Sequence, residues 1–448
     1  MHPDGLPTPQ RYWSMLAIAL GIMMSVLDSA IANIALPVIA AELHASPAEA
    51  VWVVNAYQLA IVIALLPCAS LGERVGYRRV YLVGLTIFIA GSLGCALSHT
   101  MPELVASRVA QGFGAAGIFS INGALVRFTY PHALLGRGIG LNALVVSVAA
   151  ALGPTVAAAI LAVGPWEWLF AINVPIGIVN LMVASRALPY SDRSARRFDW
   201  TSAALNALTF GLFFVGVDVF AHGRGEGAIA AVEIAAAIAA GLALVRREAS
   251  ADSPLIPIDL MKIPIFALSI ATSVFSFAAQ ALAYLALPFY FELALHRDQV
   301  ETGLLMTPWP VAIGFAAPLA GRLSDRVPAA ILGCGGLAAL AAGLALLAIL
   351  PPNASSADIV WRMALCGLGF GFFQSPNNRT LLSAAPRRRA GAAGGMLATA
   401  RLTGMTSGTA LAALFFGIAP HGAETVDLAV GAAFAVFAAI VSLMRLSK

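Results

Sequence analysis

Charged side chains are scarce in this chain: Asp, Glu, Lys and Arg make up 11% of its 448 residues, against roughly 25% in a soluble domain. Hydrophobic residues make up 60%. They come in runs of about 20 residues or more, enough for a helix to cross roughly 30 Å of hydrocarbon. The composition therefore excludes a soluble domain and indicates an integral membrane protein.

Cysteine and histidine are also rare. Cys68, Cys95, Cys334 and Cys366 all fall in apolar runs without metal-ligand spacing, so neither disulfides nor a zinc site is implied. The seven histidines lie at the N-terminus or in loops, and no H-E-x-x-H pattern occurs. We therefore expect no metal, no cofactor and no enzyme activity. The net charge of +4 is spread over loops without a basic stripe, so no nucleic-acid partner is expected.

The apolar runs predict fourteen transmembrane helices and no cleavable signal peptide, since the first run is too long for one. The eighth is the weakest, because it is rich in Ala and carries Glu233. The predicted spans lie near residues 12–37, 51–72, 79–98, 102–126, 138–161, 166–187, 200–220, 227–245, 265–291, 303–321, 329–350, 360–383, 391–416 and 425–444.

Basic residues set the predicted orientation, because cytoplasmic loops carry an excess of Lys and Arg. The odd-to-even connections hold little more than Arg224 and Arg297. We therefore expect both termini in the cytoplasm and a multi-pass protein of a bacterial inner membrane. The even-to-odd connections hold most of the others, among them Arg74, Arg78, Arg79, Arg186, Arg246, Arg247, Arg322, Arg326, Arg387, Arg388 and Arg389.

An internal repeat divides the predicted helices into two halves. "LGERVGYRRV" (71–80) follows the second span and "GRLSDRVPAA" (321–330) follows the tenth. The offset of eight spans predicts an all-α fold of two pseudo-symmetric six-helix bundles, at 1–187 and 263–448, with two additional helices in a linker at 188–262. Parallel halves are a transporter architecture with the substrate site between them.

Several motifs follow one another in an order that resembles a known family. They are "LDSAIANIALP" (27–37), "ERVGYRR" (73–79), "SRVAQGFGAAG" (107–117), "ALGPTVAAA" (151–159), "WEWLFAINVPIG" (166–177), "FDW" (198–200), "SPNN" (375–378) and "ARLTGMTSGTA" (400–410). Together they resemble the major facilitator superfamily, specifically its fourteen-spanner drug:proton antiporter branch. That resemblance implies export of amphipathic organic compounds by alternating access, driven by protons.

Asp28 and Arg108 form the predicted proton-coupling site. At 1.5 Å per residue, Asp28 lies roughly 13 Å and Arg108 about 9 Å from the outer end of its span, with Tyr57 at similar depth. An isolated charge at mid-membrane costs about 2.5–3.5 kcal/mol, so opposite charges facing one hydrated cavity are favoured. Protonation of Asp28 would then release Arg108. The alternative is a permanent ion pair that only locks the helices.

Other polar residues in the spans are candidates for a substrate cavity, although each could equally join helices by hydrogen bonds. Arg401 is the second deep cation and matches an arginine common in the resembled branch. One Asp and two Arg give a net positive cavity, so we expect neutral or anionic substrates to be handled at least as well as dications. The candidates are Tyr57, Gln111, Asn122, Gln280, Tyr284, Gln374 and Arg401.

Two further motifs have mechanical interpretations. Gly153 and Pro154 match the antiporter motif of the family, which implies a seal near the outer side; the alternative is a packing kink. The repeated loops imply a cytoplasmic gate in which an acidic side chain binds a helix N-terminus. The gate residues are Glu73, Arg74, Gly76, Arg78, Arg79, Asp325 and Arg326.

The sequence leaves two other transport functions open. A proton symporter that imports a small organic nutrient would share the fold, and so would an exporter of one anionic metabolite. The expected partners are small amphipathic substrates, protons and the lipid bilayer, and we expect the protein to act as a monomer.

Overall fold

The computed structural model describes residues 5–131, 134–191, 198–221, 227–249, 258–324, 326–351, 353–385, 390–418 and 422–447. Within these ranges the chain is helical, with no β-strand, so the predicted all-α class is confirmed. The chain divides into two compact units. The first holds Met1–Ala45 and Trp52–Ala207, and the second holds Ser46–Val51 and Leu208–Lys448.

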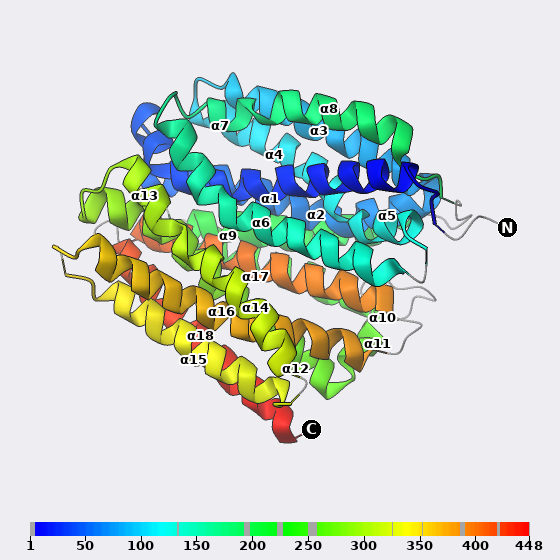
Figure 1. Cartoon of the computed structure of the whole chain (residues 1–448). Helices are drawn as coiled ribbons and strands as arrows, with labels where there is room; N and C mark the ends of the chain where they lie inside the picture. Colours follow the sequence, from blue (N-terminus) through cyan, green and yellow to red (C-terminus); the bar gives the residue numbers. More distant parts are fainter. Residues whose placement is uncertain are drawn as a thin grey trace. The chain divides into compact units, whose positions relative to one another are not determined.

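Nine of the described helices begin in the first half of the chain, and Figure 1 shows α1, α3, α4 and α8 running side by side. These helices are α1 (Gln10–Glu42), α2 (Pro47–Val75), α3 (Tyr77–Ala96), α4 (Met101–Phe119), α5 (Asn122–Thr129), α6 (Leu135–Leu161), α7 (Trp168–Ala171), α8 (Asn173–Ala187) and α9 (Trp200–Ala221).

In the second unit, α12 and α15 pack against α18, and α14 and α15 pack against α16. The elements are α10 (Gly227–Ala249), α11 (Ile258–Met261), α12 (Pro264–Phe289), the π-turn η2 (Tyr290–Ala294), α13 (Gln299–Met306), α14 (Pro308–Leu323), α15 (Ala329–Ala348), α16 (Ser356–Ala384), α17 (Ala390–Ile418), α18 (Ala423–Leu443) and the 3₁₀ turn η4 (Met444–Ser447).

Polar residues at the helix ends fix where several spans begin. Thr100, Asp298 and Ser355 cap α4, α13 and α16, and each side chain accepts from the backbone N–H three residues later. Such caps satisfy a donor that would otherwise stay unpaired. Gly76 separates α2 from α3 with a φ of 101°, a conformation that glycine adopts without a steric penalty.

Twelve candidate spans among the described residues are long and apolar enough to cross a membrane. They include the predicted eighth span, at α10, which sequence alone marked as the weakest. The other two predicted spans coincide with α9 and α17, which are helical but do not meet the criterion of length and hydropathy over described residues. A polytopic helical membrane protein is therefore confirmed, whereas the count of fourteen stays a prediction.

The repeat predicted from the loops is also present in the helix packing. A Cβ on Gly114 of α4 would lie 2.3 Å from the Phe88 nitrogen of α3. In the second unit, a Cβ on Gly369 of α16 would lie 2.5 Å from the Leu340 nitrogen of α15. Only glycine allows backbones to approach so closely. Helices α3 and α4 of the first unit, and α15 and α16 of the second, are therefore joined backbone to backbone.

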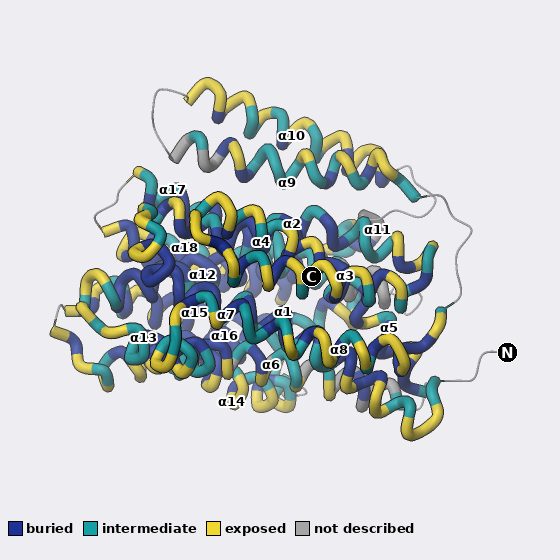
Figure 2. Tube along the Cα trace, turned by 90° about the horizontal axis from the view of Figure 1, so that it is seen from above, coloured by how far each residue is buried: buried dark blue, intermediate teal, exposed yellow. Residues whose placement is uncertain are grey.

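Helices α9 and α10 lie side by side, and the outer face of α10 is exposed (Figure 2). Gly216 of α9 allows the contact, because a Cβ there would meet the Ala230 carbonyl of α10 at 3.2 Å. On α10, Val232 is 68% exposed and Ile238 is 59% exposed. An apolar exposed face of this kind suits a helix that faces lipid.

Candidate functional site

Asp28 of α1 and Arg108 of α4 form a buried ion pair. Arg108 Nη1 lies 2.5 Å from Asp28 Oδ2, and neither side chain exposes any surface. Depth estimated from sequence placed these two residues at similar levels, and the structure confirms that they meet. Burial of two charges is tolerated only where geometry is good and the remaining polar atoms have partners.

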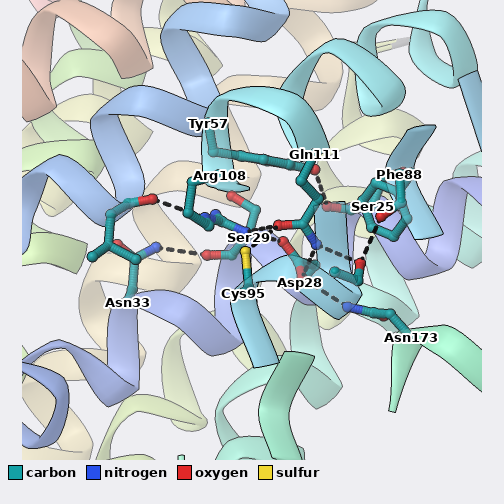
Figure 3. A network of polar contacts seen from close by, with 12 residues as sticks. Ser25, Asp28, Ser29, Asn33, Tyr57, Phe88, Cys95, Arg108, Gln111 and Asn173 are labelled. Carbon is teal, nitrogen blue, oxygen red and sulfur yellow. Dashed lines mark hydrogen bonds and ion pairs between the residues drawn. The ribbon is translucent and has the colours of Figure 1, made fainter. Parts of the chain in front are cut away.

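The Asp28 carboxylate accepts two further hydrogen bonds (Figure 3). Gln111 Nε2 of α4 and Asn173 Nδ2 of α8 each donate to Asp28 Oδ1 at 2.8 Å. Helices α4 and α8 thus supply the three groups that surround the carboxylate of α1. Its negative charge is compensated locally by one cation and two amides.

Arg108 is held by α2 and by aromatic rings. Its Nε donates to the Val53 carbonyl at 2.8 Å, and its guanidinium lies over the rings of Tyr57 at 4.1 Å and Phe170 at 5.4 Å. Its Nη2 has no hydrogen-bond partner among the described residues. A planar guanidinium suits such a site because it stacks on rings while its edge donates hydrogen bonds.

Arg108 and Gln111 act together because residues three apart lie on the same face of a helix. Arg108 Nη1 also donates to Gln111 Oε1 at 2.6 Å, and Gln111 Nε2 also donates to Ser92 Oγ of α3 at 2.8 Å. Tyr57, in turn, donates from its hydroxyl to the Ser25 carbonyl of α1 at 3.1 Å. The network therefore connects five helices of the first unit.

Sequence reasoning missed Ser92 and Asn173 as members of this network. Asn173 lies within the quoted segment 166–177 and begins α8, so the motif that contains it was the available signal. Ser92 has no motif around it, and only packing of α3 against α4 brings it to Gln111. Tyr57 and Gln111, predicted as cavity residues, are both buried inside the network.

The remaining predicted cavity residues lie outside the network. Asn122 begins α5 in the first unit, and its Oδ1 has no hydrogen-bond partner among the described residues. In the second unit, the Tyr284 ring packs edge-on against Trp309 at 5.1 Å, and Arg401 lies over Phe277 at 5.5 Å. The other two, Gln280 and Gln374, are half-buried on α12 and α16. A shared substrate cavity stays a prediction.

Gly153 and Pro154 lie in the middle of α6, where α6 packs against α1. A Cβ on Gly153 would lie 2.4 Å from the Cβ of Ala30. Ala30 is two residues after Asp28 on the same helix. The close contact thus connects the predicted antiporter motif to the helix that carries the buried acid.

The first residues of α3 are tied to the end of α8 and to the segment that follows it. Arg78 donates to the Ser185 carbonyl, and its guanidinium lies 4.3 Å from the Tyr190 ring centre. Ser191 Oγ accepts from the Tyr77 N–H at 3.1 Å. Of the other predicted gate residues, Glu73, Arg74, Arg79 and Arg326 are exposed, and Asp325 lies outside the described residues.

The second unit holds a buried polar cluster of its own, around Arg445 of η4. Arg445 Nη1 donates to Asn377 Oδ1 at 2.7 Å and to Ser269 Oγ at 3.2 Å. Arg445 Nη2 also donates to Ser442 Oγ. Sequence reasoning did not select Arg445, although Asn377 belongs to the quoted segment 375–378. Neutral side-chain oxygens therefore accept the hydrogen bonds that the Arg445 guanidinium donates, and no carboxylate takes part among the residues named.

Comparison with known proteins places these features in context. A family model described as the Major Facilitator Superfamily matches residues 18–409. The uncharacterized transporter YebQ of Escherichia coli (strain K12) is 52% identical over 450 residues, which cover 100% of this chain and 98% of that protein.

Other relatives carry more specific names. The riboflavin transporter RibZ of Clostridioides difficile (strain 630) is 30% identical, covering 91% of this chain and 88% of RibZ. The multidrug resistance protein Stp of Mycobacterium tuberculosis (strain CDC 1551 / Oshkosh) is 31% identical, covering 89% of this chain and 74% of Stp.

The fold is also similar to solved structures. A bacterial homologue of the human lysosomal transporter Spinster, solved in an inward-facing and unoccupied conformation, aligns with a TM-score of 0.67. The alignment covers 98% of this chain and 99% of that chain, at 16% identity. At this identity the similarity describes the fold alone.

Proposed function

The chain belongs to the Major Facilitator Superfamily and is a membrane-spanning transporter, and from that premise we propose that it exports amphipathic organic compounds in exchange for protons. The observation that carries the proposal is the buried ion pair between Asp28 and Arg108. Ionisable residues inside a membrane are costly, and in transporters they mark proton relays. Relatives named for multidrug resistance or efflux support the class of substrate.

In the proposed cycle, a proton neutralises Asp28 and removes the charge that holds Arg108. The guanidinium then loses its ion pair, and the helices that carry the two residues are free to separate. Because neither side chain reaches solvent in this conformation, the proton enters when the network opens. One charge moving through 100 mV supplies about 2.3 kcal/mol, enough for roughly a fifty-fold substrate gradient.

The competing role for the pair is purely structural. Its geometry alone suits that role, because the carboxylate has a cation and two amides as partners. The two roles differ in one measurable way: a lock contributes to stability only, whereas a coupling acid must also bind and release a proton during turnover.

The deciding experiment measures substrate-induced proton release from purified wild-type protein and from Asp28→Asn. The amide side chain of this variant has the same shape as the carboxylate and its oxygen can still accept from Arg108, so we expect a folded protein. Wild type should release protons on substrate addition, and Asp28→Asn should release none and should not export. Export by Asp28→Asn at the wild-type rate would leave only the structural role.

We further propose that neutral or anionic substrates are handled at least as well as dications. Asp28 and Arg108 cancel each other's charge, which leaves Arg401 as the deep charge among the cavity candidates. A resistance panel in an expressing strain tests this. Resistance confined to quaternary ammonium compounds would contradict it.

A second candidate function is proton-coupled import of a small organic nutrient. The 30% identity to a protein named as a riboflavin transporter favours keeping it. Proteoliposomes separate the two functions by direction: an antiporter accumulates substrate on the acidic side of an imposed pH gradient, and a symporter accumulates it on the alkaline side.

The finer topology is also proposed. Fourteen spans, with α9 and α17 crossing the membrane, put both termini in the cytoplasm of an inner-membrane protein that we expect to act as a monomer. Support comes from the arginine-rich even-to-odd connections. Labelling of single cysteines introduced near each terminus tests the orientation, and an externally reactive terminus would contradict it.

A further inference from the structure

Asp427 of α18 is a second buried acid, and its carboxylate lacks a hydrogen-bond partner among the described residues. Its side chain is 0% exposed. Neither Oδ1 nor Oδ2 of Asp427 forms a hydrogen bond with any residue that the structure describes. Asp427 lies four residues after Ala423, the first residue of the helix. A buried polar group without a partner is rare enough in folded proteins to require an explanation.

Among the described residues, the charges around Asp427 offer it no compensation. Glu424, one turn earlier on α18, acts on it with a charge of the same sign. The Arg362 guanidinium and Glu424 both interact electrostatically with Tyr290. The charge of Arg362 is already paired, however, because its Nη2 lies 3.0 Å from Asp358 Oδ2. An ionised Asp427 would therefore be repelled by the neighbouring Glu424 carboxylate.

The helices packed on α18 carry few titratable groups. The contacts come from α12, α15, α17 and η4, and η2 continues α12. Along these elements the titratable or charged residues are Tyr284 on α12, Tyr290 and Glu292 on η2, Cys334 on α15, Arg401 on α17 and Arg445 on η4.

Both cations in that set are too far from Asp427 to neutralise it. Arg445 follows Asp427 by 18 residues along one continuous helical path, about 27 Å at 1.5 Å per residue. Arg401 lies 17 residues before Ile418, the end of α17 that precedes α18, which is about 25 Å at 1.5 Å per residue. Asp427 lies only about 6 Å from the start of α18, so the two residues differ in depth by about 20 Å along the helix axes.

A buried carboxylate with no cation and no donor avoids the cost of its charge by taking up a proton. We propose that Asp427 is a proton-binding site, occupied in this conformation, and that it carries a second proton of the transport cycle. The second half of this statement rests on the proposed proton-coupled function. The step is a simple protonation: an O–H bond forms on the carboxylate, and it breaks when water reaches the site in another conformation.

Glu424 gives the proton a route. It lies three residues before Asp427, on the same face of α18, and nearer to the helix end. Glu424 is 8% exposed, whereas Asp427 is 0% exposed. A proton that leaves Asp427 thus meets an acceptor one turn closer to the end of the helix.

Infrared spectroscopy of the purified full chain tests the proton-binding site without any assumption about transport. Wild type should show the carbonyl band of a protonated carboxylic acid, shifted in D₂O, and Asp427→Asn should lack it. Asp28→Asn should keep it. If Asp427→Asn does not fold, Asp427→Glu should move the band instead of deleting it. An identical band in wild type and in both Asp427 variants would overturn the proposal.

The limiting substrate gradient in proteoliposomes tests the second proton. One pH unit corresponds to a tenfold concentration ratio for each proton. With a neutral substrate, no membrane potential and one pH unit imposed, wild type should reach about a hundred-fold gradient and Asp427→Asn about tenfold. Asp358→Asn, which removes a partly exposed acid at the start of α16, should match wild type.

The outcomes separate the two proposals. Equal limiting gradients in wild type and Asp427→Asn would overturn the second proton and leave proton-coupled export standing. No pH-driven transport by wild type would overturn the proposed function, and the infrared band would still decide whether Asp427 holds a proton.

Discussion

Asp28 in the first unit and Asp427 in the second are both hidden from solvent, yet their surroundings differ in kind. Asp28 receives hydrogen bonds from Arg108, Gln111 and Asn173. Asp427 receives none from the described residues. Burial alone therefore does not define what an acid can do. Asp28 can take up a proton only when its partners move, whereas the proton proposed on Asp427 needs only a path for water in order to leave.

Helix α4 of the first unit and helix α16 of the second repeat this contrast. Gly112 and Gly114 of α4 pack against α2 and α3 as Gly367 and Gly369 of α16 pack against α14 and α15. When these glycines are aligned, the position of Arg108 is equivalent to that of Met363, and the position of Gln111 to that of Cys366. The second unit keeps the packing and has no charge at either place. The charged network is thus not required by the architecture.

The largest expected effect comes from making the first unit resemble the second. Arg108→Met leaves Asp28 buried without its cation, and breaking a buried pair in this way costs about 3–5 kcal/mol. We expect a large drop in the unfolding midpoint of the purified protein, measured by thermal denaturation in detergent.

The double variant Asp28→Asn with Arg108→Met sharpens this prediction. It removes both charges, so it should recover most of the stability that the single change loses. If Arg108→Met alone had the same unfolding midpoint as wild type, the ion pair would contribute nothing to the stability of the fold.

A smaller effect is expected at the glycine contacts. Gly114→Ala places a Cβ 2.3 Å from the Phe88 nitrogen, and overpacking of this kind costs about 1–3 kcal/mol. Gly335→Ala on α15 is the matched control, because nothing lies within 4 Å of its added Cβ. Both are compared by thermal denaturation. Equal midpoints would contradict the backbone contact between α3 and α4.

The smallest effect is expected from Asp427→Asn. If Asp427 is protonated, the change replaces one neutral group with another, and stability should change by about 1 kcal/mol or less. The same substitution at Asp28 weakens a charged hydrogen bond, with an expected loss of about 1–3 kcal/mol. The two midpoints, measured in parallel at neutral pH, test the contrast. Equal losses would place both acids in the same protonation state.

The helices could be predicted from the sequence because each apolar run is long and bounded by polar loops. A helix lies at each of the fourteen predicted spans, including the doubtful one at α10. The interruptions inside three spans were not predicted. Span four is divided between Phe119 and Asn122, a break at Ile172 separates α7 from α8, and a break at Thr307 separates α13 from α14. All three breaks are too short to interrupt the hydropathy of the run.

The site was only partly predictable. Asp28 and Arg108 stood out because a charge inside an apolar run is conspicuous. Asp427 did not, because it lies only two residues inside the predicted span 425–444, next to Glu424 in the preceding connection. Its burial is a property of the packing of α12 and α15 around α18, and sequence patterns carry no information on that.

The contact of α3 with α4 dictates where the polar network must divide if it opens. Backbone-to-backbone contact at the glycines leaves little room for these two helices to slide or rotate past each other, so we expect them to move as one piece. Ser92, Arg108 and Gln111 then travel together, and Asp28 stays with Asn173. Opening would therefore break the hydrogen bonds that Arg108 and Gln111 donate to the Asp28 carboxylate, and the strength of these two bonds would determine how easily the network opens.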